Sequence, residues 1–198
     1  MIITLATSLI VASIQNPTLV TPGDPALKPV CDSHSATALE LVVVAPSGSE
    51  RVVARLQRSK SRSTELGQPV CIIVQRYLRD SSTDVDSSIV NAATLAPVRY
   101  SARVNSSVER FWFRGDSAGG AVVEGDSARR VYAERSPDPF FLAVADLSVL
   151  AALPLAPGYE ARFASYNPGR GFHDVQIRVE GLDTLVTLGT PTPAWRVS

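Results

Sequence analysis

The residue types that could support catalysis are concentrated around His34. The stretch CDSHS sets His34 beside Asp32 and Ser33, the three residue types of a Ser-His-Asp triad. Neighbours in sequence do not build such a triad, because its members converge from separate segments onto an oxyanion hole. We also predict no G-x-S-x-G nucleophile elbow, in which a serine stands between a strand and a helix. The other histidine, His173, follows a glycine turn and is expected to be exposed. The sequence therefore predicts no catalytic residue and no enzyme.

Metal-binding chemistry has two candidates, and neither is persuasive. Asp80, Asp84 and Asp86 lie in a serine-rich segment, where spaced carboxylates could hold calcium. That segment lacks the glycine and the terminal glutamate of an EF-hand loop, so we predict a solvated acidic loop. The two cysteines form no CxxC pair and no paired histidines accompany them, which argues against zinc. No metal and no cofactor are predicted.

Cys31 and Cys71 have two alternative interpretations. In an exported protein, a single pair of cysteines is often a disulfide, which here would close a loop of about 40 residues. The alternative is a pair of free thiols in the core. The disulfide would tie the N-terminal segment to the strand around Val70–Val74.

Composition indicates one globular domain. The chain has 198 residues, of which 45% are hydrophobic and 19% charged. Lys plus Arg and Asp plus Glu are 19 each, so the formal net charge is zero. The chain as a whole therefore has no excess of positive charge that would attract nucleic acid, and we predict no nucleic-acid partner.

The N-terminus suggests export. Residues 1–15 include an uncharged apolar run that is too short to span a bilayer but suits a signal peptide or an N-terminal anchor. A buried first strand is the alternative, since no Lys or Arg precedes the run. Residues 16–36 hold four prolines and are predicted to form an extended tail. The expected location is the periplasm, with attachment to the membrane surface and no membrane span.

Residues 37–198 are predicted to form a single antiparallel β domain. Strand-like runs recur about every ten residues, with Gly, Pro, Asn and Asp between them. In 98–104, Val98, Tyr100 and Ala102 alternate with polar residues, as in a strand with one wet face. The fold class is mainly β: an antiparallel curved sheet forming a barrel, half-barrel or sandwich.

One short helix is expected near 146–153. Asp146 is predicted to cap it, and Pro154 ends it within two turns. Leu147, Leu150 and Ala151 would form its apolar stripe. Because a helix this short cannot stand alone, it should lie across the concave face of the sheet. An apolar ligand held beneath it would contact three residues: Leu147, Leu150 and Leu153.

Two groups of arginines are candidate interfaces. Arg110, Trp112 and Arg114 alternate with Glu109, Phe111 and Phe113, so an exposed Trp112 flanked by arginines would suit a protein partner. The sequence favours the other interpretation, in which Trp112 packs in the core or between layers. A second group could contact lipid headgroups or an acidic partner, or could simply be a solvated strand end. It comprises Arg51, Arg55 and Arg58.

Several stretches together resemble a known family. They are NAATLAPVRYSAR, ERFWFRGD, DLSVLAALPLAPGYEARF, VQIRVEGLDTLVTLG and PAWRV, within Ile89–Val197. They resemble an exported bacterial family of β-rich domains of unknown function, similar to the half-barrels of lipoprotein carriers. The resemblance implies a curved sheet, a short covering helix and an envelope location, and no catalytic residues. Family members continue past the Trp step, so an unpaired edge that a partner strand could cover is a further expectation.

Two functions follow from these observations. The first is a non-catalytic structural or interaction protein of the cell envelope, such as a membrane-extrinsic subunit that stabilises a larger respiratory or photosynthetic membrane complex. Its partners would be proteins at a membrane surface. The alternative is a periplasmic binding or carrier module for a lipid or another apolar small molecule.

Overall fold

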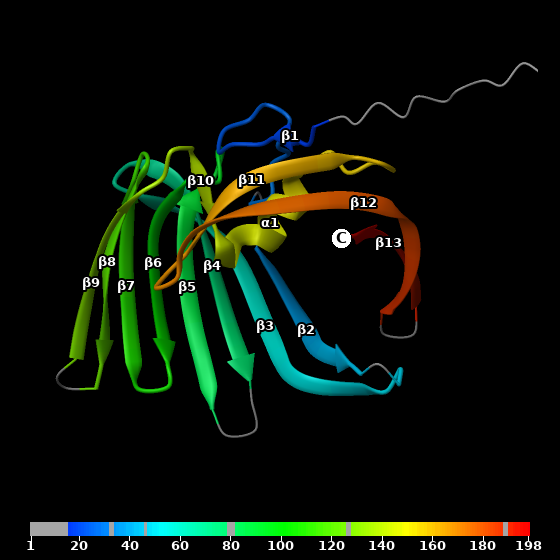
Figure 1. Ribbon diagram of the computed structural model, residues 1–198, viewed down its shortest axis with the longest axis horizontal. Helices are drawn as coiled ribbons and strands as arrows, with labels where there is room; N and C mark the ends of the chain where they lie inside the picture. Colours follow the sequence, from blue (N-terminus) through cyan, green and yellow to red (C-terminus); the bar gives the residue numbers. More distant parts are fainter. Residues whose placement is uncertain (1–15, 32–33, 46, 79–81, 126–127, 188–189) are drawn as a thin grey trace, which may run out of the picture.

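The computed structural model describes residues 16–31, 34–45, 47–78, 82–125, 128–187 and 190–198. They form two β-sheets, in which most strand pairs are antiparallel, with one short helix between the sheets (Figure 1). This confirms the predicted mainly β class with a curved antiparallel sheet. The predicted signal peptide or anchor at 1–15 lies outside the described residues.

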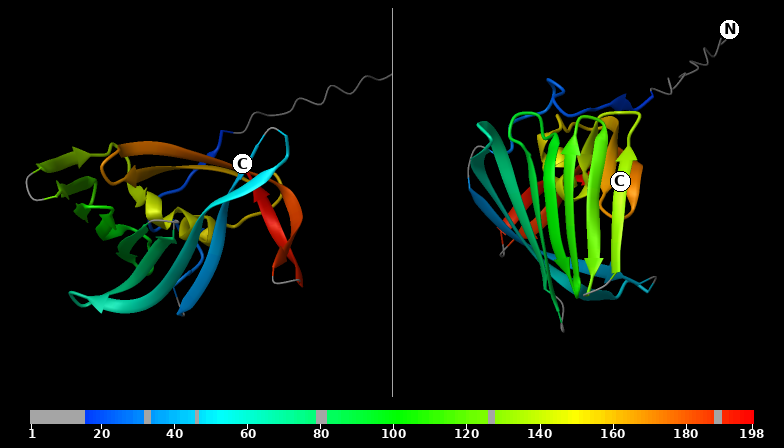
Figure 2. Two further views of the ribbon diagram at one scale, coloured as in Figure 1. Left: turned by 90° about the horizontal axis from the view of Figure 1, so that it is seen from below. Right: turned by 90° about the vertical axis from the view of Figure 1, so that its left-hand side faces the viewer.

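The larger sheet is an eight-stranded meander in which every strand pairs with its neighbour in sequence. Its strands are β2 (Ser35–Val44), β3 (Glu50–Glu65), β4 (Gln68–Leu78), β5 (Thr83–Asn91), β6 (Pro97–Val104), β7 (Ser107–Arg114), β8 (Ser117–Glu124) and β9 (Ala128–Arg135). Among the described residues, the end strands β2 and β9 do not pair with each other, so the sheet curls without closing into a barrel (Figure 2).

The smaller sheet crosses the concave side of the meander (Figure 1). It contains β1 (Thr18–Leu19), β10 (Phe140–Leu142), β11 (Glu160–Asn167), β12 (Gly171–Thr187) and β13 (Thr190–Val197). β1 and β10 pair with β11 in parallel, and the other pairs are antiparallel. The final strand pairs with β12 from Thr190 to Val197. β12 and β13 therefore form an antiparallel pair.

An aromatic cluster joins the two sheets. Tyr166 of β11 and Phe172 of β12 have ring centroids 4.7 Å apart, and Phe113 of β7 lies 5.6 Å from Tyr166. Phe111 and Phe140 complete the cluster, each 1% exposed. Burying an aromatic side chain of this size stabilises the fold by about 1.5–3 kcal/mol. Contacts within this cluster therefore contribute strongly to the packing of the two sheets against each other.

The helix occupies the predicted place with a different orientation. A 3-10 turn, η1 (Ala143–Ala145), leads into α1 (Asp146–Ala152), so the N-cap is Ala145 and the predicted Asp146 cap is wrong. The predicted stripe is also wrong, because Leu147 is 44% exposed while Val149 and Ala152 are fully buried. The buried residues of α1 are Ser148, Val149 and Ala152.

Two polar stretches are strand, and one of them is the acidic segment that was predicted to be a loop. β3 continues through Ser61 to Glu65 and turns at Leu66 and Gly67, which have φ values of 50° and 77°. β5 starts at Thr83 and includes Asp84 and Asp86. Pairing with β4 along both stretches overrides their polar composition.

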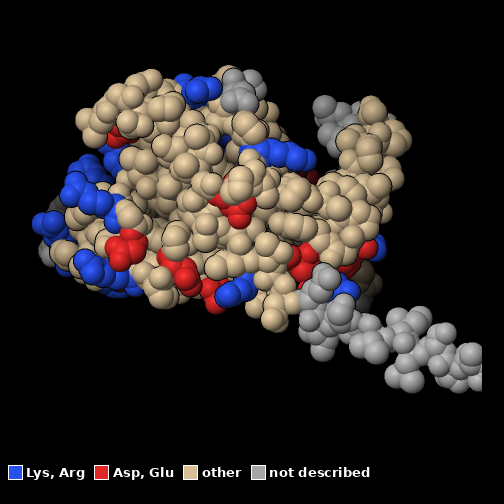
Figure 3. Space-filling model, turned by 90° about the horizontal axis from the view of Figure 1, so that it is seen from above, with Lys and Arg blue, Asp and Glu red and all other residues tan. Residues whose placement is uncertain are grey.

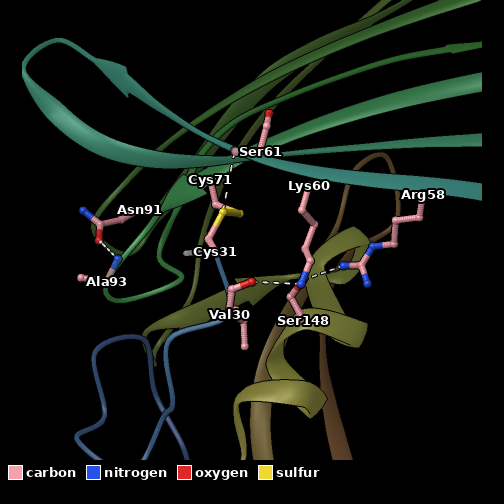
Figure 4. Close-up of a disulfide and its surroundings, with 9 residues drawn as sticks. All are labelled: Val30, Cys31, Arg58, Lys60, Ser61, Cys71, Asn91, Ala93 and Ser148. Carbon is pink, nitrogen blue, oxygen red and sulfur yellow. Dashed lines mark hydrogen bonds between the residues drawn. A yellow bond between two sulfur atoms is a disulfide. The ribbon is translucent and has the colours of Figure 1, made fainter. Parts of the chain in front are cut away.

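Residues 16–31 of the proline-rich segment 16–36 are docked onto the domain. Val20 and Cys31 are each 1% exposed, and the amide of Val20 donates to the carbonyl of Arg162 at 2.9 Å. Cys31 forms a disulfide with Cys71 of β4, with Cα atoms 5.8 Å apart (Figure 4). The disulfide fastens this segment to the inner face of the meander.

Removing the disulfide should lower stability. The Cys31→Ser/Cys71→Ser variant should lose about 4 kcal/mol of unfolding free energy, because the bond closes a loop of 40 residues in the unfolded chain. Urea unfolding of the oxidised protein and the variant measures the difference. A reductant should destabilise the wild type and leave the variant unchanged. Equal midpoints for the oxidised wild type and the variant would contradict this account.

Candidate functional site

The outward surface of β6–β9 is basic and carries an exposed tryptophan. We call this surface the arginine–tryptophan face. Among its described outward positions there is no Asp or Glu. Its charged residues are Arg99, Arg103, Arg110, Arg114, Arg129 and Arg135, all of them exposed. Of these, Arg99 forms an ion pair with Glu65 at 3.3 Å.

Strand register brings these residues together. Trp112 pairs with Arg99 on β6 and with Gly119 on β8. Arg110 pairs with Ser101 and Ala121. Since residues directly opposite in an antiparallel pair have Cβ atoms about 4.5–5.5 Å apart, the four strands present one continuous surface. The right-hand view of Figure 2 looks onto these strands.

Trp112 lies on the sheet surface with 59% of the residue exposed. A Cβ atom at Gly119 would come within 2.9 Å of the indole atoms Cε2 and Nε1, so the ring rests on the glycine. Val131 and Val123 are also exposed, at 68% and 38%. The face therefore combines positive charge with an apolar centre. Of the two arrangements that the sequence left open, the structure has the exposed one: Trp112 faces outward, and Phe111 and Phe113 are buried on the opposite face.

Trp112 separates two shallow grooves on this face. The first, of about 490 Å³, is lined by Val108, Arg110, Trp112, Ala121, Val123 and Arg129. The second, of about 810 Å³, lies on the other side of the indole and is lined by Arg114, Arg135 and the carboxylate of Glu134, among others. Each groove thus combines apolar side chains with two guanidinium groups, and the second groove also contains one acid. Figure 3 shows Lys and Arg side chains gathered at the end of the molecule where β7–β9 lie.

The other predicted arginine group does not extend this surface. Arg51 and Arg55 lie on β3, four strands away from β7 in the sheet order, and Arg55 forms an ion pair with Glu40 at 3.1 Å. Arg58 turns inward, where its Nη2 donates to Ser148 Oγ of α1 at 2.6 Å (Figure 4). The expectation that these three arginines form one exposed cluster is therefore wrong, because alternation along β3 separates Arg58 from its neighbours.

Arg58 belongs to a row of polar residues across the concave face. Pairing places Arg58 opposite Gln75, Gln75 opposite Asp86, Asp86 opposite Ala102, and Ala102 opposite Glu109. Gln75 Nε2 donates to the carbonyl of Val144 at 2.6 Å. Together, Arg58 and Gln75 bond the η1–α1 segment to the sheet beneath it.

Asp86 is the buried acid of this row. It is 7% exposed, and its Oδ1 has no hydrogen-bond partner within the described part of the chain. Burial raises the pKa of Asp86 to about 7; the positive charge of Arg58 opposes this rise and the negative charge of Glu109 adds to it. Burial also lowers the pKa of Arg58, against the opposing charge of Asp86. The carboxyl is therefore protonated in the native state below neutral pH.

Asp146 is a second shifted acid, at the start of α1. Burial raises its pKa to about 6, while a hydrogen bond from Ser165 Oγ at 3.2 Å and the nearby His173 oppose the rise. Asp84, predicted to be in the solvated loop, is instead 4% exposed and accepts the amide of Asn105 at 3.0 Å. That loop prediction is wrong because strand β5 turns every second residue inward.

The predicted ligand-lining leucines divide between two environments. Leu153 is 2% exposed and packs in the core, whereas Leu147 is 44% exposed. Leu150 is partly buried against the core. Leu147, Leu150 and Leu153 therefore do not form one buried wall beneath α1. Burial patterns of short helices depend on the turn that precedes them, which sequence periodicity does not specify.

A serine motif absent from the predictions occurs in the β7–β8 hairpin. Gly115–Gly119 spells G-x-S-x-G, but here it joins two antiparallel strands, and Ser117 Oγ donates to Asp116 Oδ1 at 2.7 Å. A nucleophile elbow needs a helix after the serine to supply amides for its oxyanion hole. His34 and His173 are both exposed. Within the described residues, no group of three or more His, Cys, Asp or Glu is placed to hold a metal.

The face and the row contain residues that the sequence analysis did not single out as sites. Arg129, Val131 and Arg135 lie an even number of positions apart on β9, so all three side chains point to the same face of the sheet. This alternation is visible in the sequence. The short β7–β8 and β8–β9 turns, if recognised, would have placed these residues on the same face as Trp112.

Glu109 is half-buried, and its alternation with Phe111 and Phe113 already placed it on their face. The buried Asp86 carries no such signal, because it lies in a polar stretch of the sequence.

Comparison with known proteins gives a family but no characterised relative. The family described as "Protein of unknown function (DUF3108)" matches residues 52–198. The chain belongs to this family. No curated protein and no solved structure matches the chain. The DUF3108 match begins earlier than the resemblance inferred from Ile89 onward, and it includes the arginine–tryptophan face and the buried row. In the described residues, no helix is long and apolar enough to cross a bilayer.

The shifted pKa of Asp86 predicts a pH-dependent stability. Between about pH 4 and pH 7 the native state holds a proton that the unfolded chain has lost, so Asp86 makes the free energy of unfolding fall as the pH rises. The Asp86→Asn variant should gain about 2–4 kcal/mol relative to the wild type between pH 4 and pH 8. Urea unfolding across this range measures the gain.

A matched control is Asp116→Asn, in the exposed β7–β8 turn. Its stability relative to the wild type should stay constant over the same range. A constant difference for Asp86→Asn as well would show that Asp86 titrates normally.

Proposed function

We propose that this protein is a non-catalytic interaction protein of the cell envelope, which docks on a negatively charged surface through its arginine–tryptophan face. It would serve as a membrane-extrinsic subunit that stabilises a larger membrane complex. The observation that carries the proposal is the set of six exposed arginines around Trp112, with no acid among the described outward positions of β6–β9.

Charge distribution supports a docking role. The chain is neutral overall, with 19 basic and 19 acidic residues. A surface that carries only positive charge is therefore due to the separation of basic from acidic residues in the fold, and not to an excess of basic residues in the chain. Such a surface accelerates and orients encounter with an oppositely charged partner. Exposed tryptophan and arginine are the residue types enriched at the energetic centres of interfaces.

The interior supports a structural role. The aromatic cluster bridges the two sheets, and Arg58 and Gln75 hydrogen-bond the η1–α1 segment to the larger sheet. These contacts across the interior suit a protein that acts through its surface. Periplasmic location and attachment to the membrane are parts of this proposal and follow from the sequence of residues 1–15.

The second candidate function is a carrier for a lipid or another apolar small molecule. The observation in its favour is α1, a short helix over the concave face with Leu147 exposed at 44%. If the helix opened, the ligand would replace its apolar contacts. Organic extraction of the purified protein followed by mass spectrometry tests this function, and a stoichiometric lipid would favour it over docking.

Charge reversal tests the docking role. The Arg110→Glu/Arg129→Glu variant should lose most of the wild type's copurification with membrane subunits, by about tenfold, because it turns attraction into repulsion at the centre of the face. Tagged protein is purified from native membranes after crosslinking, and the recovered subunits are quantified.

The control carries the same charge change elsewhere. Arg162→Glu/Arg178→Glu places it on β11 and β12, at exposed positions of the smaller sheet. It should copurify like the wild type. Recovery that is equal for both double variants would overturn the proposal.

A further inference from the structure

We propose that the occupant of the arginine–tryptophan face is the headgroup layer of an anionic phospholipid bilayer, with lipid phosphates held in the two grooves beside Trp112. This inference rests on the proposed function, since it names the partner of the same face. It is distinct from the carrier hypothesis, because the lipid stays in the bilayer and contacts the outer surface of the sheet.

The first argument is charge. Five arginines of the face have no ion pair among the described residues: Arg103, Arg110, Arg114, Arg129 and Arg135. Guanidinium groups bind phosphate oxygens through two parallel N–H donors. A fluid layer of lipids can move a phosphate to each arginine, so it matches this dispersed pattern without a fixed arrangement of acids.

The second argument is the mixture of chemistry within each groove. The groove of about 490 Å³ combines the guanidinium groups of Arg110 and Arg129 with an apolar floor formed by Val123 and its neighbours. Apolar floor and cationic rim correspond to the glycerol and phosphate regions of a phospholipid. A purely acidic protein surface would leave the floor without an apolar partner.

The third argument is Trp112. Its indole lies flat over Gly119 and is 59% exposed, so it extends along the sheet surface between the two grooves. Tryptophan is enriched at membrane–water interfaces, where its apolar body and N–H group contact different layers. Val131, at 68% exposure, lies on the neighbouring strand and adds apolar surface beside it.

Vesicle binding tests the proposal with the full chain. The probes are vesicles of phosphatidylglycerol mixed with phosphatidylcholine, and vesicles of phosphatidylcholine alone, separated by flotation. The wild type should bind the anionic vesicles about tenfold more tightly than the neutral ones, and added salt should weaken this preference. The Arg110→Gln/Arg129→Gln variant should lose about tenfold in affinity. Arg162→Gln/Arg178→Gln, on the smaller sheet, should bind like the wild type.

Fluorescence places the contact at Trp112. The chain has two tryptophans, so Trp195→Phe leaves Trp112 as the sole indole. Its emission should shift to shorter wavelength with anionic vesicles and stay unchanged with neutral ones. The apolar residues 1–15 are common to every variant, so differences between variants report on the face.

The outcomes separate this inference from the proposed function. Equal binding to both kinds of vesicle, or no shift of Trp112 emission, would overturn the lipid proposal. If copurification with membrane subunits still depended on Arg110 and Arg129, the docking role would stand with a protein as the occupant. Binding to anionic vesicles without any membrane association in cells would instead overturn the docking role and leave the lipid contact.

Discussion

Unbroken antiparallel pairing from β2 to β9 is the constraint on which the rest of the structure depends. Each strand pairs with its sequence neighbour. Once the outward residues of one strand are fixed, the pairing register therefore fixes which residues of the next strand face outward. A shift of one residue at the β6–β7 turn would bury Trp112 and expose Phe111. The same register that builds the core thus builds the arginine–tryptophan face.

The two faces of the meander have different physical tasks. The concave face is covered by the smaller sheet and by α1, so its aromatic residues supply the cohesive energy between layers. The outer face is not covered by another layer, so it does not need apolar residues for packing and can carry many charged side chains. Repulsion among exposed arginines is screened by solvent and salt, and a stable core can tolerate it.

The row of polar residues beneath α1 lowers the stability of the fold but holds the helix in place. Arg58 and Gln75 bond the helix segment, which has too few residues to be stable alone. Asp86 accompanies them at a site where burial disfavours its charge. The disulfide at Cys31 and the hydrogen bond from Lys60 to the carbonyl of Val30 hold the adjoining N-terminal segment on the same side (Figure 4).

Local pattern alone predicted the mainly β class with a curved antiparallel sheet and the helix near 146–153. Alternation in 98–104 and 107–114 also determined which residues share a face, because the period of a strand is set by its backbone. Tertiary structure decided what that pattern could not. It turned Arg58 inward, buried Asp84 and Asp86, rotated α1, and aligned the arginines of four strands on one surface. The reason is that burial and proximity depend on what covers each face, and the covering sheet comes from residues far away in the sequence.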